Sequence, residues 1–392
     1  AMSVLTLDLR PGAGIGAFSL GMPVCEALAY IEQHHSVFDV VHIKFNDEDP
    51  LQFDLVISFP EHGFHLRFEP RTQRLRLIEV YDVQRLQMRY ATSSIGGPSV
   101  AATFVAVYAL FGPTFPGSFD AKRNIYTLFY PGLAFTFPIP GQYTNCCQDR
   151  EAELPIEFPD GTTPVMSRVC IYDSALGGNV EAGANLAALI KKAIPPQLPS
   201  GSLYMEEVHA KLAEDLFFTT SKKRLPFGAS PQDVWAELGR PDGIHQKQVD
   251  PMVIHSASDP RPNSALCGDY FYNYFARGLD ILFDGQTHRI KKFVLHTNFP
   301  AHTDFNSYIK CNFVIHCPLT GSDEKDSHYV ITGDTKWPQI QQLLGDAGRA
   351  AIQTQGSVSN PFGPTFVYGY RNIAFEVMKN GHIATVTLFQ TN

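Results

Sequence analysis

The sequence has little of what marks several specialised protein classes. Its seven cysteines are an odd number at irregular spacing, and no CxxC pair occurs among them. A disulfide framework and a zinc site built from paired cysteines are therefore not expected. The 392 residues carry a formal net charge of −8 at pH 7. We do not expect such an acidic chain to have the broad basic surface with which general nucleic-acid-binding proteins neutralise phosphates.

Long apolar segments are also scarce. The stretch 91–119 has no charged residue, but its continuous apolar part is limited to residues 100–111, and prolines stand at positions 98, 113 and 116. Because a membrane span needs about 20 apolar residues, a buried helix is the better interpretation. The first residues do not combine a basic segment with an apolar one, so a secretory signal is not expected either. We expect a cytoplasmic protein.

The motifs of common catalytic sites are missing as well. The sequence contains no P-loop, no HExxH and no GxSxG. The glycine-rich stretch GAGIG at 12–16 has no strand–loop–helix context of the kind that binds a dinucleotide, so we expect a turn there. Histidines are numerous, but three or four would have to converge to hold a metal ion, and the sequence alone cannot place them together. We expect no enzymatic activity, no cofactor and no bound metal.

What the sequence does contain is a pattern that occurs four times. Alternating apolar residues run into a tight turn, continue through a second alternating stretch and a polar turn, and end in a third. Period-two alternation between glycine or asparagine turns is typical of antiparallel hairpins, so each occurrence predicts a three-stranded meander. The four meanders are expected at 54–82, at 124–140 completed by 165–173, at 273–300 and at 366–390.

A helix is expected before each meander. The four segments that predict these helices are 20–34, 95–113, 227–241 and 332–348. Three of the helices are expected to end at a glycine, namely Gly112, Gly239 or Gly345.

In the helix within 227–241, Ser230 is a candidate N-cap and Pro231 suits the first helical position. The spacing of Val234, Trp235 and Leu238 predicts the buried stripe of this helix.

These elements predict an α+β fold. It consists of four repeats of a helix plus a three-stranded antiparallel meander, arranged as two related halves. The N-terminal half is expected at 3–175 with an insertion at about 141–163, and the C-terminal half at 222–392. The connecting segment 176–221 should hold a short helix that ends before Pro195. The stretch that starts at Ser202 fits either a helix or an edge strand.

Two basic groups are candidates for contact with an anionic membrane. In the strand around 290–296, alternation places Lys292 on one face with Ile290 and Val294, and Lys291 on the opposite face with Phe293. The two lysines would then not form one phosphate clamp without a bulge or twist, and the alternative is a solvated edge-strand lysine that prevents aggregation.

The second basic group consists of Lys222, Lys223 and Arg224 beside two phenylalanines. Basic residues beside aromatic ones can rest weakly on an anionic membrane, and a plain linker is the alternative.

A further alternative is a lipid or small-molecule carrier. An antiparallel sheet crossed by a helix can enclose an apolar pocket, and Tyr270, Phe271, Tyr272, Tyr274 and Phe275 could line it. A core built from 29 phenylalanines and 16 tyrosines explains the same residues without a ligand.

The segment 269–306, DYFYNYFARGLDILFDGQTHRIKKFVLHTNFPAHTDFN, closely resembles the signature segment of the phagosome assembly factor 1 family. Further matching segments follow in the right order, and they are FSLGMPVCEAL, RLIEVYDVQRLQMRY, NPFGPTF and AFEVMKNGHIATVTLF. The individual helix–meander modules also resemble those of BamE-type lipoproteins, and that resemblance concerns the fold alone.

The resemblance to the phagosome assembly factor 1 family implies a non-enzymatic adaptor of autophagy. Such an adaptor would act at the phagophore, or preautophagosomal structure, in complex with a WD-repeat β-propeller protein. It would be recruited peripherally to a phosphoinositide-containing membrane, directly or through that partner, and it would need no cofactor. The residues that match the family signature and are candidates for binding a partner or ligand are Asn273, Tyr274, His296, Thr297, Asn298, Pro300 and His302.

Overall fold

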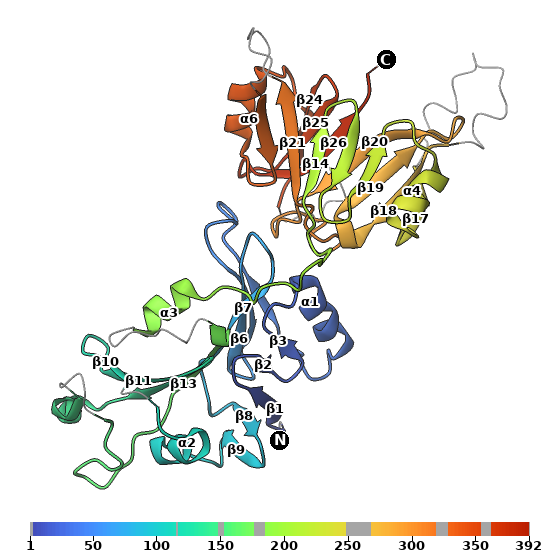
Figure 1. The fold of residues 1–392 in the computed structure, drawn as a ribbon. Helices are drawn as coiled ribbons and strands as arrows, with labels where there is room; N and C mark the ends of the chain where they lie inside the picture. The colour runs from blue at the N-terminus through green and yellow to red at the C-terminus, as the bar shows by residue number, and fades with distance from the viewer. Residues whose placement is uncertain are drawn as a thin grey trace. The chain divides into compact units, whose positions relative to one another are not determined.

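The structure is a computed structural model that describes residues 3–114, 117–147, 153–175, 185–247, 268–318, 328–353 and 362–391. The chain forms two compact units. Unit 1 comprises Ala1–Asn46 and Pro50–Leu198, and unit 2 comprises Asp47–Asp49 and Pro199–Asn392. Within the described residues, each unit contains one five-stranded and one eight-stranded sheet (Figure 1).

The eight-stranded sheet of unit 1 has the strand order β10-β11-β12-β13-β7-β6-β5-β4. Two four-stranded antiparallel meanders form it, and they join where their last strands, β7 and β13, pair. The strands are β4 (His42–Lys44), β5 (Leu55–Phe59), β6 (Phe64–Phe68), β7 (Leu75–Val80), β10 (Ser118–Asp120), β11 (Ile125–Tyr130), β12 (Leu133–Pro138) and β13 (Arg168–Tyr172).

The eight-stranded sheet of unit 2 follows the same plan, with the order β17-β18-β19-β20-β26-β25-β24-β23. Its two meanders join through the pairing of β20 with β26. The strands are β17 (Gly243–Gln246), β18 (Tyr270–Tyr274), β19 (Leu279–Phe283), β20 (Ile290–His296), β23 (Ala351–Gln353), β24 (Thr365–Tyr370), β25 (Ile373–Val377) and β26 (Ile383–Phe389).

The five-stranded sheets also share one plan. In each, a three-stranded meander pairs in parallel with a later strand, β1 with β8 in unit 1 and β14 with β21 in unit 2. The strands of unit 1 are β1 (Leu5–Arg10), β2 (Gly14–Ile15), β3 (Phe18–Ser19), β8 (Leu86–Tyr90) and β9 (Ser93–Gly96). Those of unit 2 are β14 (Val208–Lys211), β15 (Asp215–Phe218), β16 (Lys223–Pro226), β21 (Phe313–Pro318) and β22 (His328–Thr332).

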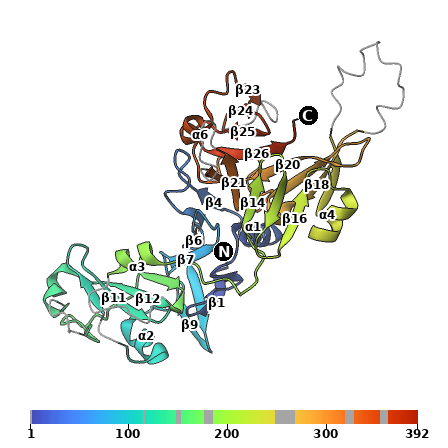
Figure 2. The ribbon, with the colours of Figure 1, turned by 45° about the horizontal axis from the view of Figure 1, so that its top comes forward.

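Each meander of the eight-stranded sheets follows a helix in the chain. These helices are α1 (Val24–Gln33), α2 (Phe104–Phe111), α4 (Pro231–Leu238) and α6 (Trp337–Leu344). A further helix, α3 (Leu186–Lys192), lies alongside β11 and β12 in unit 1 (Figure 2) and packs on residues of β7, β12 and β13. In the described part of the chain, no helix combines the length and apolar character that a membrane crossing requires.

The structure confirms a mixed α/β fold rich in strands, whose four sheets are consistent with two halves. It corrects the expectation of purely antiparallel sheets, because the five-stranded sheets each contain a parallel pair. It also adds a short strand before each meander, and three of these four strands have only three residues. Strands this short are too brief for alternation to be recognised in the sequence.

The predicted connecting segment, 176–221, contains α3, β14 and β15 within its described residues. The stretch from Ser202, which fitted a helix or an edge strand, forms β14, β15 and β16, and β14 is the central strand of its sheet. Lys223 and Arg224 lie in β16, so the alternative of a plain linker at 222–224 is wrong. The expected insertion near 141–163 lies between β12 and β13 and begins with a 3₁₀ helix, Gly141–Cys147.

The helix termini follow from local sequence. Ser230 caps α4 by accepting a hydrogen bond from the backbone of Asp233, whose carboxylate accepts one from the Ser230 backbone. This reciprocal arrangement satisfies two backbone donors at the start of the helix. The expected glycines end α2, α4 and α6, with φ between 79° and 83°. Such values favour glycine because it has no Cβ atom.

The predicted stripe of α4 is only partly buried. Val234 is fully buried, and Leu238 packs against the core, but 47% of Trp235 is exposed. Consecutive residues of a helix point about 100° apart, so the narrow contact line through Val234 leaves Trp235 facing solvent.

One core fills the space between the two sheets of unit 2. Buried apolar side chains from all three strands of the β14–β16 meander meet those of β19, β20, β25 and β26, and α4 and α6 add Val234 and Ile340. Along the eight-stranded sheet every second residue points into this core, so the residues between them face the opposite side.

A tyrosine joins sheet and helix in three of the meanders. The last residue of β11, β18 or β24 donates a hydrogen bond from its hydroxyl group to the carbonyl oxygen of the glycine that ends the preceding helix. The pairs are Tyr130 with Gly112 at 2.9 Å, Tyr274 with Gly239 at 3.0 Å, and Tyr370 with Gly345 at 2.7 Å. The corresponding residue of the first meander is Phe59, at the end of β5.

Replacing Tyr274 by phenylalanine removes the hydrogen bond to Gly239 and keeps the ring. We expect the free energy of unfolding to fall by about 1 kcal/mol, a typical value for a buried neutral hydrogen bond. Urea titration followed by circular dichroism measures this change. The matched control is Tyr272→Phe, because Tyr272 lies on the same strand and packs against the core from a partly buried position. Equal stability of both variants would show that the Gly239 bond contributes nothing.

Candidate functional site

Most of the predicted candidate residues lie either on the side of the unit 2 sheet that faces away from the core or in the loop that follows β20. Asp280 stands between Leu279 and Ile281, which both point into the core, so its carboxylate points outward. The same alternation places four more polar residues on this side. We call this set the polar face, and its members are Asn273, Asp280, His296, Glu376 and Thr385.

Asp280 is hydrogen-bonded through both carboxylate oxygens. The amide of Asn273 donates to Oδ1 at 2.7 Å, and Nε2 of His296 lies 2.7 Å from Oδ2. The hydroxyl group of Tyr308 lies 2.7 and 2.8 Å from the two oxygens, and the Tyr308 ring stacks on the His296 ring at 3.6 Å. His245 extends the network, since its Nδ1 lies 2.7 Å from Oδ1 of Asn273.

Glu376 forms the second centre of the polar face. Thr385 on the neighbouring strand donates to Oε1 at 3.1 Å, and Thr365 donates to Oε2 at 2.7 Å. Nε2 of His302 lies 3.2 Å from Oε2. Glu376 and His302 are 8% and 9% exposed, so water contributes little to solvating this ion pair.

The loop 297–312 between β20 and β21 closes the polar face. His302 contacts Glu376, and Tyr308 contacts Asp280, so two side chains of the loop are each held on a buried carboxylate. Thr297 anchors the start of the loop, because its hydroxyl group contacts the carbonyl oxygens of Ile383 and Ala384 at 2.7 and 2.8 Å. We call residues 297–312 the covering loop.

The left-handed backbone of Asn298 and Asn306 shapes the covering loop. Their φ values are 55° and 70°, and asparagine tolerates this region better than most residues do. The side-chain oxygen of Asn298 accepts a hydrogen bond from the backbone of Asn306 at 2.8 Å, so the loop is also tied to itself.

The buried charges change the acidity of the groups around them. Burial alone would raise the pKa of Glu376, but the hydrogen bond and positive charge of His302 lower it. Burial opposes protonation of His302, yet the hydrogen bond and charge of Glu376 raise its pKa. Burial and the negative charge of Asp280 raise the pKa of Tyr308, which therefore stays a hydrogen-bond donor. Each of these three groups is held by a hydrogen bond to a buried partner within unit 2.

The structure brings the predicted candidate residues together, and it buries most of them. Of the seven, six are less than a tenth exposed, and Pro300 is half-buried. Tyr274 lies on the core side of the sheet, and its hydroxyl group donates a hydrogen bond to the carbonyl oxygen of Gly239. The side chains of Asn273, His296, Thr297, Asn298 and His302 hydrogen-bond within unit 2.

Sequence reasoning missed the residues that hold this network. Asp280, Tyr308 and Glu376 receive or complete the hydrogen bonds of the predicted residues. One signal could have identified the two acids. Each is a single charged residue within an otherwise apolar strand, LDILF and IAFEV, and a buried carboxylate needs partners.

The predicted basic residues are less available than expected. Lys291 forms an ion pair with Asp269 at 3.0 Å. A register shift between β19 and β20 leaves Lys291 without a cross-strand partner, so Ile290 shares the core with Phe293. This bulge makes the predicted alternation wrong at Ile290, which was expected on the same face as Lys292. Lys292 is partly buried, and burial lowers its pKa.

The second basic group, residues 222–224, has fewer charged partners than Lys291 has. Arg224 binds Asp215 at 2.7 Å and covers the Phe217 ring. Lys222 is exposed at a turn, 6.0 Å from the same ring. Lys223 is half-buried in β16.

Unit 1 covers the same side of its sheet in a different way. There the buried carboxylate is Glu79, whose Oε1 accepts a hydrogen bond from Arg67 at 2.7 Å, and His65 lies 3.1 Å away. Burial opposes ionisation, but the hydrogen bond and charge of His65 together with the charge of Arg67 lower the pKa of Glu79 to about 2. Arg76 binds the carbonyl oxygens of Ile190 and Ala193 at the end of α3.

The described residues contain no group of three or more histidine, cysteine, aspartate or glutamate side chains arranged to hold a metal ion. The five aromatic residues expected to line an apolar pocket are not among the residues that line a pocket in unit 2. That pocket is lined by other residues, among them Leu344 of α6 and Tyr370 of β24.

The pH dependence of stability should report on the His302–Glu376 pair. The raised His302 pKa contributes stability that is complete below the ordinary value of 6.5 and is lost as the pH rises through the folded-state pKa. The lowered Glu376 pKa contributes stability that is complete above 4.5 and is lost as the pH falls through its folded-state pKa. Both contributions are therefore complete between pH 4.5 and 6.5.

Glu376→Gln should lower the free energy of unfolding by about 1–3 kcal/mol in this window, and by less at higher pH. Urea titrations from pH 4 to 9 measure the difference. Glu32→Gln, at an exposed position on α1, is the control and should give a small difference that does not vary with pH. A Glu376→Gln difference that is also independent of pH would show that the pair is not charged.

Comparison with known proteins finds matches that extend over nearly the whole chain. A family model described as phagosome assembly factor 1 matches residues 14–389. A PHAF1 protein of Arabidopsis thaliana is 67% identical over 391 residues, which cover 100% of this chain and 94% of that protein. A PHAF1 protein of Drosophila melanogaster is 33% identical, with 99% of this chain and 95% of that protein covered. No solved structure matches the chain, so the resemblance to BamE-type modules stays a prediction.

Proposed function

The chain belongs to the phagosome assembly factor 1 family, and we propose that it is a non-enzymatic adaptor of autophagy. It would act at the phagophore, or preautophagosomal structure, in complex with a WD-repeat β-propeller protein. The family match supports this proposal because it extends over nearly the whole chain. An adaptor needs surfaces of fixed shape, and the polar face of unit 2 suits that need because its buried groups are engaged in hydrogen bonds.

The observation that carries the proposal is the way in which the covering loop is fixed. Residues with polar side chains usually contact solvent, yet here His302 and Tyr308 attach the loop to the sheet. Asn298 holds the loop to itself through the backbone of Asn306. The opposite side of the loop remains accessible, and Thr303 and Ser307 are exposed on it. We propose that this accessible side contacts the β-propeller. The buried residues would then act indirectly, by holding the loop in one conformation.

Tagged protein recovered from the source cells in near-physiological salt tests this proposal. We expect a WD-repeat protein in near-equal amount with the wild-type chain. Ser307→Arg should reduce its recovery at least tenfold, because a bulky charge in the centre of an interface prevents close packing. Ser36→Arg is the matched control, since Ser36 is an exposed serine of unit 1.

Two variants of buried residues complete the test. Asn298→Ala and His302→Ala should also reduce recovery, through a loosened loop, while thermal unfolding still shows a folded protein. Full recovery of the partner with Ser307→Arg and with both of these variants would show that the covering loop is not the interface.

We further propose that the membrane contact is made mainly through the partner. Lys291 and Arg224 already form ion pairs, and Lys292 is partly buried. The remaining candidates, Lys222 and Lys223, would add about 1 kcal/mol each near an anionic surface, which is too little for stable binding.

Vesicle co-sedimentation with the isolated chain measures direct binding. In near-physiological salt we expect the same small sedimented fraction with phosphatidylcholine vesicles and with vesicles that also contain phosphatidylinositol 3-phosphate. Strong, phosphoinositide-dependent sedimentation that Lys222→Gln/Lys223→Gln abolishes would contradict the indirect route. Lys191→Gln/Lys192→Gln on α3 is the control with the same loss of charge.

We also propose that the four helix–meander segments are copies of one unit, arranged as two related halves near 3–175 and 222–392. The turn before the second long strand supports the view that the four segments repeat one unit. In every segment, the residue directly before that strand has a left-handed backbone. These residues are Gly63, Gly132, Gly278 and Asn372, with φ values of 68°, 79°, 64° and 70°.

A further inference from the structure

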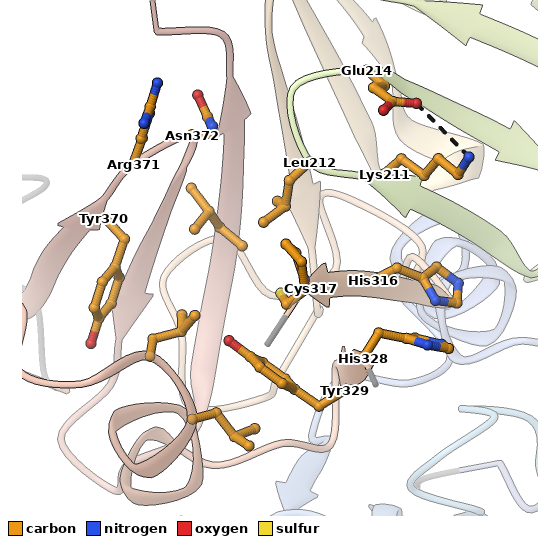
Figure 3. A pocket seen from close by; sticks show the side chains of 14 residues that line it. Lys211, Leu212, Glu214, His316, Cys317, His328, Tyr329, Tyr370, Arg371 and Asn372 are labelled. Carbon is orange, nitrogen blue, oxygen red and sulfur yellow. Dashed lines mark ion pairs between the residues drawn. The ribbon is translucent and has the colours of Figure 1, made fainter. Parts of the chain in front are cut away.

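Unit 2 contains a cavity of about 670 Å³ away from the polar face (Figure 3). The turn between β14 and β15, the end of β21 and the start of β22 form one part of its wall. The last turn of α6 and the turn between β24 and β25 form the other part. A volume of this size lies within the range of about 300–1,000 Å³ that is typical of small-molecule sites.

The inner wall of the cavity is apolar. Leu344 of α6, Leu212 of the β14–β15 turn and Ile373 of β25 line it, together with the ring of Tyr329. Ile373 belongs to the buried core, and Leu212, Leu344 and Tyr329 pack against that core. A ligand in this cavity would therefore replace water on apolar surface. The favourable free energy of binding from this replacement scales with the area that the ligand covers.

The rim of the cavity is cationic. Figure 3 shows Arg371 on one side of the apolar wall and Lys211 with His316 on the other. Lys211 is 3.9 Å from Glu214, and both side chains are about two-thirds exposed, so this pair nearly cancels its own charge. Burial and the nearby His209, His328 and Lys211 lower the pKa of His316, which is therefore neutral at pH 7.

Arg371 is the rim group whose charge no residue of the described ranges compensates. It is exposed, and among the residues that the structure describes it has no ion-pair partner. The tyrosine hydroxyl groups nearby are neutral donors. Tyr370 uses its hydroxyl group on Gly345, and burial raises the pKa of Tyr329 to about 12. Counted over the described residues, the rim thus presents one net positive charge beside an apolar wall, on a chain whose net charge is −8.

We propose that this cavity binds a single-chain amphiphile with one carboxylate head. The chain would lie against Leu212, Leu344 and Ile373, and the carboxylate would meet the guanidinium group of Arg371, whose planar fork suits a carboxylate. The single net charge of the described rim residues matches a monoanion. The inference is independent of the proposed adaptor role, because the cavity and the covering loop share no residue.

Isothermal titration of the full chain with laurate tests the proposal, with dodecanol as the uncharged probe of the same chain length. We expect laurate to bind once per chain and Arg371→Gln to weaken it about tenfold or more, as the loss of a charge-assisted pair does. Dodecanol binding should not change in this variant. Arg123→Gln, at an exposed turn of unit 1, is the matched control and should bind laurate like the wild type.

A second variant tests the apolar wall. Leu343 lines the cavity from the surface of α6 and is 36% exposed, so Leu343→Asp should leave the fold intact. This substitution should weaken the binding of both laurate and dodecanol at least tenfold.

Three results would overturn the proposal. The first is the absence of laurate binding to the wild-type chain, which would leave the apolar wall to a protein partner. The second is laurate binding that neither Arg371→Gln nor Leu343→Asp weakens, which would place the ligand elsewhere. The third is an equal loss of affinity for laurate and for dodecanol in Arg371→Gln, which would show that the headgroup charge is not recognised.

Discussion

A carboxylate buried in a sheet must be compensated by hydrogen bonds or by an opposite charge, and the candidate site of unit 2 follows from this constraint. Asp280 and Glu376 point away from the core because their neighbours in the strand point into it. Without further structure they would face solvent. The chain instead places the covering loop on them, and each carboxylate is met by one side chain of that loop. The loop conformation therefore depends on two buried charges.

The two units show that the same sheet plan can be completed in different ways. In unit 1 the bulged residue Arg76 binds the carbonyl oxygens at the end of α3, where a positive charge also complements the helix dipole. In unit 2 the corresponding bulge exposes Lys291, and the loop 297–312 takes the place of a helix. A fixed loop that covers a sheet face leaves an irregular outer surface, which is suited to recognition of a partner.

Much of the fold could be predicted from the sequence because its signals are local. The long strands of the meanders alternate with period two, and α4 carries recognisable caps at both ends, Ser230 and Gly239. The short first strands and the parallel pairs could not be predicted in this way. A strand of three residues, such as β4, has no period to recognise. The pairing of β1 with β8 joins residues separated by both α1 and a whole meander.

Several residues of the candidate site could be identified from the sequence, but their arrangement and burial could not. Asn273, His296 and His302 were identified through a family resemblance that the family match confirms. Their burial depends on where the covering loop folds back, and no local pattern contains that information. The acids that organise them, Asp280 and Glu376, carry a signal of their own, since a lone charge in an apolar strand requires partners.

The polar face fixes the covering loop, and hydrogen–deuterium exchange of wild type and Asp280→Asn tests this dependence most directly. The substitution keeps the shape of the side chain and removes the charge that Tyr308 and His296 share. We predict that amides of residues 297–312 exchange at least tenfold faster in the variant, while those of β14, β15 and β16 keep their protection. Unchanged protection of the loop would contradict the account, because the loop would then be held by something other than the buried carboxylate.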